Sequence, residues 1–326
     1  QDICHTNGVY YGQNVISQNM IIADRRQLLN GNEFILGVSG GGKSFTAKGE
    51  VINQVLAGNA DIIIIDPERE YSPLVRALGG EIINISATSP THINAMDMVE
   101  GYGDEGSPII DKSEFVLSLF EQLDRNGIGP AQRSLIDRCT EDIYEDYQNG
   151  GKVPTLCALR EKLLEQDERE AKSLALALEL FTDGSLDAFA HETNVDVNNR
   201  MVVYDIMDLG KQLKTMGLLV ITDAMLNRVT ENWKKGKRTH IFLDEFHVVF
   251  ENEHSGTFFN SAWRRFRKRN AFPTAITQNV EYLLDSVLAS TMLSNSEYIV
   301  MLNQAASDRQ KLAELLNISN EQMSYI

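Results

Sequence analysis

Short apolar runs alternate along the chain with stretches in which apolar residues recur at helical spacing. The apolar runs lie at residues 34–38, 61–66, 81–85, 200–205, 239–244, 272–278 and 298–302. Continuous runs of this kind are typical of strands that are buried on both faces, as in a parallel sheet. Because the intervening segments carry helical periodicity, the pattern predicts an α/β fold with a mostly parallel sheet and helices on both faces. Residues 281–288 are among these segments and are predicted to form one helix.

A long middle segment interrupts this alternation. Helical patterns follow one another near residues 111–124, 130–147, 155–166 and 169–181. No strand-like run separates them, so the segment is not expected to add to the sheet. We therefore predict an all-helical subdomain at residues 99–190, inserted into a core that is formed by residues 1–98 and 191–326.

A glycine-rich stretch follows the first of the apolar runs. It reads Gly-Val-Ser-Gly-Gly-Gly-Lys-Ser over residues 37–44 and matches the pattern G-x-x-x-x-G-K-[ST], between a predicted strand and a predicted helix. In such a loop the backbone N–H groups and the helix N-terminus hold a polyphosphate. Lys43 is expected to reach the β- and γ-phosphates, and the Ser44 hydroxyl to bind Mg²⁺. The predicted nucleotide-binding residues are Ser39, Gly40, Gly41, Gly42, Lys43, Ser44 and Phe45.

Two further strand ends carry polar residues that suit ATP hydrolysis. Asp244 and Glu245 follow an apolar run about 200 residues after the lysine. The aspartate of such a pair supports Mg²⁺, and the second acid polarises the attacking water. Gln278 closes the next run, where an amide could orient water or sense the γ-phosphate. The alternatives are a solvated acidic turn and a simple strand cap.

The chain is acidic, with 30 Lys and Arg against 46 Asp and Glu, a net charge of −16. Such a chain is a poor general binder of nucleic acid, because neutralisation of phosphates provides most of that affinity. The one dense basic run, residues 264–269, lies at the end of a predicted helix. It could supply an arginine to a neighbour's nucleotide, contact DNA locally, or form a solvated face. We favour the first hypothesis, with Arg267 as the arginine.

The cysteines and the length of the apolar runs bear on the cellular location of the protein. Cys4, Cys139 and Cys157 form no C-x-x-C pair, which favours a reduced cytosolic compartment over a secreted one. No apolar run approaches the roughly 20 residues that span a bilayer. Because the sequence opens with Gln1, we expect it to be a segment of a longer protein.

The motifs together resemble one family. In chain order they are residues 8–14, the stretch 30–44, Asp-Pro-Glu-Arg-Glu at 66–70, Asp-Glu-Phe-His at 244–247, the basic segment 263–271 and Thr-Gln-Asn at 277–279. This ordered set is similar to the conjugative-transfer ATPases of type IV secretion systems, the TraC/TrbE/CagE kind (the fourth component of the VirB set). The resemblance implies a RecA-like P-loop NTPase of the additional-strand class, with an inserted helical subdomain.

The resemblance also implies site residues and partners. It implies that ATP and Mg²⁺ bind at Lys43, Ser44 and Asp244, that Glu245 activates water and Gln278 is the sensor, and that Arg267 serves a neighbouring subunit. Expected partners are further copies of the chain, forming a homo-hexamer, and the inner-membrane complex and coupling protein of the secretion system. The implied location is the cytoplasmic face of the inner membrane.

Two other functions are also compatible with these motifs. A DNA-pumping coupling protein or HerA/FtsK-type translocase shares the motifs, although its pore should be basic and this chain is acidic. DNA binding is therefore expected to be weak. A nucleotide-gated scaffold that binds ATP without hydrolysing it is the other alternative, and the intact pair Asp244 and Glu245 argues against it.

Overall fold

The computed structural model describes residues 3–58, 60–103, 107–123, 127–250 and 253–324, with the side chains of residues 211, 212 and 254 also left undescribed. Residue 124, the last of one predicted helix, lies outside these ranges.

A parallel sheet of seven strands forms the centre of the described part, in the order β5-β6-β4-β7-β8-β3-β9. The strands are β3 (Glu33–Leu36), β4 (Ala60–Asp66), β5 (Glu81–Asn84), β6 (Met201–Asp205), β7 (Arg238–Leu243), β8 (Ala271–Thr277) and β9 (Tyr298–Met301). All residues of β4, β6 and β8 are buried, as their apolar composition predicts. The predicted α/β fold with a mostly parallel sheet is confirmed.

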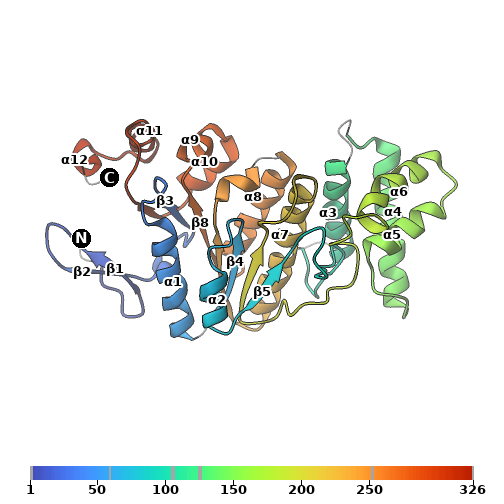
Figure 1. Ribbon diagram of the computed structural model, residues 1–326, viewed down its shortest axis with the longest axis horizontal. Helices are drawn as coiled ribbons and strands as arrows, with labels where there is room; N and C mark the ends of the chain where they lie inside the picture. Colours follow the sequence, from blue (N-terminus) through green and yellow to red (C-terminus); the bar gives the residue numbers. More distant parts are fainter. Residues whose placement is uncertain (1–2, 59, 104–106, 124–126, 251–252, 325–326) are drawn as a thin grey trace.

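Helices cover both faces of this sheet (Figure 1). The helices that flank the sheet or lie in the C-terminal part are α1 (Lys43–Ala57), α2 (Ser72–Ala77), α7 (Lys211–Lys234), α8 (Glu253–Lys268), α9 (Val280–Asp285), α10 (Val287–Ser294), α11 (Ala306–Leu316) and α12 (Asn320–Met323). Successive strand residues face opposite layers. Ile62 and Ile64 of β4 pack in the apolar cluster that contains Val51 of α1, whereas Ile63 and Ile65 pack in the cluster that contains α7 and α8.

One predicted helix is wrong in its extent. Residues 281–288 do not form a single helix, because the chain is extended at Ser286 (φ −83°, ψ 117°) between α9 and α10. The Ser286 side chain accepts a hydrogen bond from the backbone N–H of Ala289 and so caps the second helix. Serine competes with the helix for backbone hydrogen bonds in this way, and the apolar periodicity did not reveal the break.

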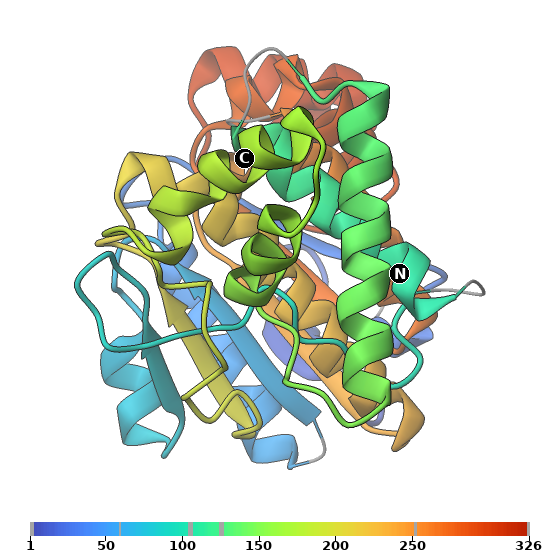
Figure 2. The same cartoon turned by 90° about the vertical axis from the view of Figure 1, so that its right-hand side faces the viewer.

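Four helices lie between β5 and β6, and the described residues of this segment contain no strand. They are α3 (Pro108–Leu123), α4 (Pro130–Gln148), α5 (Leu156–Leu164) and α6 (Arg169–Thr182). Figure 2 looks onto this end of the molecule and shows the long α4, in green, on the right of the picture. Their apolar residues belong to the same continuous cluster as α7 and α8. The division into residues 99–190 and a core of 1–98 and 191–326 stays a prediction.

The first residues form a small separate sheet. Strands β1 (Val9–Gln13) and β2 (Met20–Ala23) pair antiparallel, and a short 3₁₀ turn, η1 (Arg25–Gln27), leads from them to β3. Buried Arg25 donates to Glu33 of β3 and to Thr274 of β8, both at 2.7 Å. These bonds connect the amino end of β3 to the middle of β8, at the end of β3 that lies away from the site.

Candidate nucleotide-binding site

The motifs predicted from the sequence meet at one edge of the sheet. Strands β4, β7, β8 and β3 are neighbours, and all end at this edge because they are parallel. Leu36 pairs with Thr277, so Gln278 lies level with Gly37, where the glycine-rich loop begins. Ile65 pairs with Leu243, so the first acid of the pair lies level with the end of β4. Ligands of open α/β sheets bind at such carboxyl ends.

The glycine-rich loop adopts a conformation that only glycines take readily. Gly40 (φ 72°) and Gly42 (φ 95°) are left-handed, and α1 starts immediately after Gly42. No side chain caps the helix, so the N–H groups of its first turn remain free for an anion. The loop is held at its base because the Val38 N–H donates to the Asn303 carbonyl, 2.9 Å away.

Lys43 is buried and carries no counter-anion. Its Nζ donates to the carbonyl of Val38 at 3.1 Å, and no carboxylate lies within ion-pair distance in the described chain. An ammonium group held by one neutral carbonyl can exchange that bond for a charge-assisted bond to phosphate. Ser44 has no hydrogen-bond partner among the described residues, while Ser39 and Phe45 are exposed at the rim.

Asp244 is a buried acid that forms no ion pair with a described residue. Its pKa is raised from 3.8 to about 7, mainly by burial; the charges of Glu245, Glu70 and Asp66 contribute to the rise, and a hydrogen bond from the Glu245 N–H opposes it. Such a group is stabilised in its ionised form by a cation. A carboxylate and a serine hydroxyl at the same edge of the sheet are hard oxygen donors, which fit Mg²⁺. The described residues contain no group of three or more His, Cys, Asp or Glu that could hold a metal alone, and Mg²⁺ is commonly shared between one or two protein groups and phosphates.

Glu245 has a strained backbone. Its φ of 45° is left-handed, which costs energy for a residue with a Cβ and is common at functional sites. Its Oε2 lies 3.2 Å from Nδ1 of His247. The turn therefore separates the two acids: Asp244 stays at the end of the strand, and the Glu245 side chain is directed beside His247.

Gln278 is exposed at the edge of the site. No described residue hydrogen-bonds its amide, whereas the next residue, Asn279, is occupied as the N-cap of α9. The structure thus brings Lys43, Ser44, Asp244 and Gln278 to one edge of the sheet, although they lie far apart in the sequence.

The loop between β4 and α2 adds groups to which the sequence had assigned no role. Asp66 accepts hydrogen bonds from the N–H groups of Glu70 (3.0 Å) and Tyr71 (2.8 Å). Glu70 lies 3.6 Å from Nζ of Lys48 on α1, and the Tyr71 side chain is fully buried. The sequence did contain a signal for this loop, because the polar stretch Asp-Pro-Glu-Arg-Glu directly follows a buried strand. Which residues lie next to the loop depends on the order of the strands, which the sequence did not reveal.

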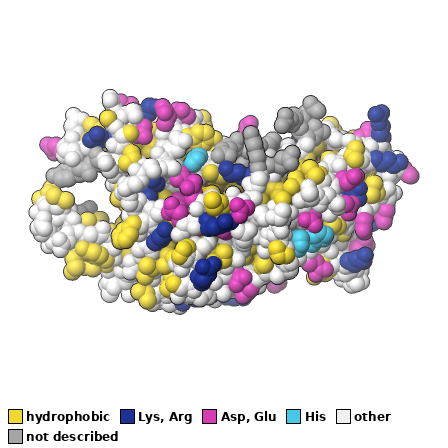
Figure 3. All heavy atoms as spheres, viewed as in Figure 1, with side chains coloured by type: hydrophobic (Ala, Val, Ile, Leu, Met, Phe, Trp, Pro, Cys, Tyr) yellow, Lys and Arg dark blue, Asp and Glu magenta, His cyan; other side chains and the backbone are white. Residues whose placement is uncertain are grey.

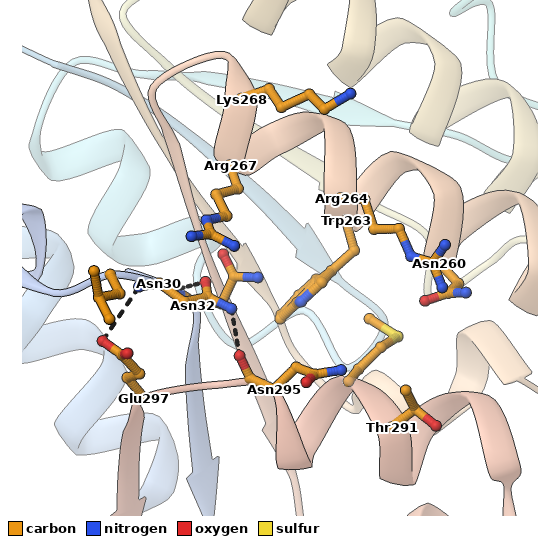
Figure 4. Close-up of a pocket in the computed structure, with 12 residues that line it drawn as sticks. Asn30, Asn32, Asn260, Trp263, Arg264, Arg267, Lys268, Thr291, Asn295 and Glu297 are labelled. Atoms are coloured by element: carbon orange, nitrogen blue, oxygen red, sulfur yellow. Dashed lines mark hydrogen bonds between the residues drawn. The ribbon is translucent and has the colours of Figure 1, made fainter.

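The basic run lies at the opposite edge of the sheet. Arg264, Arg267 and Lys268 of α8 line a cavity of about 600 Å³ together with Asn30 and Asn32, which precede β3 (Figure 4). Figure 4 shows Arg267 pointing from α8 toward this loop. None of the three cations has an ion-pair or hydrogen-bond partner among the described residues.

The position of the cavity decides which nucleotide Arg267 can reach. The four residues of β3 separate the cavity from the phosphate loop, a rise of about 13 Å. Arg267 therefore cannot contact a nucleotide bound to its own Lys43. Arg269, by contrast, is buried and donates to Thr230 and to the Gly103 carbonyl, so it is not available to another molecule.

Comparison with known proteins agrees with this geometry. The family profile described as an AAA-like domain matches residues 9–324. Comparison with curated protein sequences finds no significant match.

Solved structures share the fold. VirB4 of Thermoanaerobacter pseudethanolicus is similar with a TM-score of 0.83 and 23% identity, over 99% of this chain and 92% of that one. The plasmid coupling protein TrwB in complex with ADP and Mg²⁺ is similar with a TM-score of 0.57 and 14% identity, over 93% and 76%. TrwB with the non-hydrolysable ATP analogue ADPNP gives 0.58 and 14%, over 93% and 77%.

Proposed function

The chain belongs to the AAA-like domain family, and we propose that it is an ATPase motor domain that powers a type IV secretion or conjugation apparatus. The observation that carries this proposal is the meeting of Lys43, Ser44, Asp244, Glu245 and Gln278 at one carboxyl edge of the sheet. Binding of ATP needs the first two of these residues, and hydrolysis needs the others. The similarity in fold to VirB4 supports the assignment to secretion.

Each residue has a distinct role in the proposed reaction. Lys43 leaves the Val38 carbonyl and binds the β- and γ-phosphates. Ser44 and Asp244 hold Mg²⁺, which when bound offsets the charge of the phosphates. Glu245 polarises the attacking water, and Gln278 contacts that water or the γ-phosphate. Ser39 to Phe45 form the backbone cradle, with Gly40, Gly41 and Gly42 in its turn.

Arg267 acts on a neighbouring copy of the chain in this proposal. It lies at the edge opposite its own phosphate loop, without a partner among the described residues, and it opens into a cavity. A second copy docked on this face would bring its own nucleotide to the arginine, whose charge stabilises the transferring phosphoryl group. A closed homo-hexamer satisfies this requirement for every subunit.

The wider assembly follows from the same proposal. The inner-membrane complex and the coupling protein of the secretion system are the proposed partners, and the cytoplasmic face of the inner membrane is the proposed location. Within the described residues, no helix combines the length and the apolar composition that crossing a bilayer requires.

A DNA-translocating coupling protein is the second candidate, because TrwB shares the fold. Two observations disfavour it. The similarity to TrwB is lower than that to VirB4, and the net charge is −16. On the face shown in Figure 3, Lys and Arg side chains are scattered among Asp and Glu, so this face offers no continuous basic track for DNA.

ATP turnover measured against protein concentration, with and without double-stranded DNA, tests the proposal. We expect turnover to rise more than linearly with concentration, to be indifferent to DNA, and to fall about 10³-fold or more in Arg267→Ala. Arg76→Ala is the control, since Arg76 is exposed on α2 and has no described partner. A linear rate that DNA stimulates would favour the translocase. Equal turnover of Arg267→Ala and wild type would exclude the role in trans.

A further inference from the structure

The loop of residues 66–70 is held in place from two sides. Asp66 is buried and accepts the N–H groups of Glu70 and Tyr71, which fixes the backbone after β4. Arg69 has a left-handed φ of 57° and pairs with Asp205 at the end of β6. Because Arg69 is held toward β6, the next side chain, Glu70, is directed to the other side, toward α1.

Glu70 faces the part of α1 that begins the site. Its Oε2 lies 3.6 Å from Nζ of Lys48, and Lys48 follows Ser44 by four residues, on the same face of the helix. The charge of Glu70 is also close enough to Asp244 to raise the pKa of that acid. The Glu70 carboxylate thus lies between α1 and the end of β7, on the side of Asp244, whose N–H donates to Ile65 at the end of β4.

Tyr71 lies beside the same acid. Its side chain has no exposed surface, and its hydroxyl is close to the Asp244 carboxylate without completing a hydrogen bond to a described residue. Burial and the charges of Asp244, Asp66 and Glu70 raise the pKa of this hydroxyl, so it stays protonated and can donate. Buried hydroxyls without a partner are uncommon in native proteins, and a bound water or ligand usually satisfies them.

We propose that Glu70 is a second catalytic acid of the ATPase reaction, accepting a hydrogen bond from the attacking water. This rests on the ATP hydrolysis proposed above. A water molecule has two O–H groups: Glu245 takes the proton of one, Glu70 fixes the other, and the two bonds aim the oxygen at the γ-phosphorus. Lys48 is a positioning residue, since it acts by holding Glu70.

Hydrolysis of the γ-phosphate forms one bond and breaks one. The water oxygen forms a bond to the γ-phosphorus, and the bond from that phosphorus to the β–γ bridging oxygen breaks. The electron pair of the broken bond stays on the bridging oxygen of ADP. One water proton passes to Glu245 and then to solvent, and the other stays on the phosphate product. Glu70 keeps its charge throughout.

A merely structural role for Glu70 predicts something different. The Glu70 and Lys48 side chains are 41% and 31% exposed, and exposed ion pairs contribute little to stability. Removing the pair should therefore leave the fold intact. If Glu70 only supported the loop, its loss would weaken nucleotide binding and turnover together.

Steady-state kinetics of Glu70→Gln with ATP and Mg²⁺ are the test, with Glu68→Gln as the matched control from the exposed part of the same loop. We expect kcat to fall about 100-fold in Glu70→Gln and to stay unchanged in Glu68→Gln. Binding of a non-hydrolysable ATP analogue should stay within about twofold of wild type in both variants. Lys48→Met should lower kcat about tenfold, and Lys48→Arg should restore it.

The outcomes separate this inference from the proposed function. Wild-type kcat in Glu70→Gln overturns the role of Glu70, and so does a loss of analogue binding that accounts for the whole effect, but either leaves the ATPase assignment intact. If wild-type protein hydrolyses no ATP while it still binds the analogue, the proposed function and this inference both fail.

Discussion

Two buried lysines, Lys43 in the phosphate loop and Lys112 at the base of the helical segment, have opposite charge environments. Lys112 of α3 is fully buried, lies 2.6 Å from Asp223 of α7, and donates to the Asp97 carbonyl at 2.8 Å. Its ammonium group also lies 5.0 Å from the centre of the Tyr102 ring. Lys43 has one backbone carbonyl and no acid.

The acids of the two regions differ in the same way. Asp223 is buried but receives hydrogen bonds from Lys112 and from the Tyr102 hydroxyl. Asp244 is buried beside other acids and receives one backbone N–H. The pair at the helical segment is neutral within the protein, which suits a structural contact. At the phosphate loop the cation and the acid are each left uncompensated, so a ligand that brings phosphates and a metal supplies the missing charges.

The largest effect is expected on the free energy of unfolding when the ion pair between Lys112 and Asp223 is broken. Lys112→Met removes the cation that is hydrogen-bonded to the buried Asp223 carboxylate and leaves only the weaker influence of Arg265, so we expect the free energy of unfolding to fall by about 3–5 kcal/mol. Denaturant unfolding at pH 7 measures it. Replacing both partners by apolar residues, as in Lys112→Met with Asp223→Leu, should recover much of the loss. A single variant as stable as wild type would mean that the pair is not a structural contact.

The matching substitution at the phosphate loop should act on function instead. Lys43→Met removes an ammonium group that binds no carboxylate among the described residues, so we expect ATP turnover to fall about 10³-fold while the free energy of unfolding changes by less than about 0.5 kcal/mol. Turnover and denaturant unfolding of the same preparation measure both quantities. A strongly destabilised variant would show that Lys43 stabilises the fold, and the contrast between the two lysines would disappear.

The smallest effect concerns the pH dependence of stability through Asp244. Its pKa in the folded protein is about 7, above the ordinary value of 3.8, so the folded state binds this proton more tightly than the unfolded state. The contribution to stability is therefore complete below about pH 4 and is lost as the pH rises through 7. Between pH 5 and pH 7 we expect wild type to lose about 2–3 kcal/mol relative to Asp244→Asn, without nucleotide or Mg²⁺. Parallel stability profiles of the two proteins would contradict a raised pKa.

Local patterns in the sequence predicted most of the elements and the fold class correctly. The apolar runs predicted the strands, and the parallel sheet confirms the fold class; the AAA-like profile and the similarity in fold to VirB4 agree with the resemblance to type IV secretion ATPases. The prediction of a single helix at residues 281–288 is wrong for a local reason as well. Ser286 caps the start of a second helix, whereas the apolar periodicity runs through this position without a break. The roles of Lys43, Glu245 and Gln278 remain predictions.

The sequence by itself determined the conformation of the phosphate loop and the alternation of strands and helices, because both depend on residues that are close along the chain. Only the tertiary structure decided which strand ends are neighbours. Placing β8 between β7 and β3 brings Gln278 level with the loop, and the position of β4 beside β7 brings Glu70 near Asp244. It also placed Arg267 at the far edge of the sheet. The order of strands follows from the packing of whole elements that lie far apart in the sequence, such as Glu33 and Tyr298 of the paired strands β3 and β9, and local propensity carries no information about it.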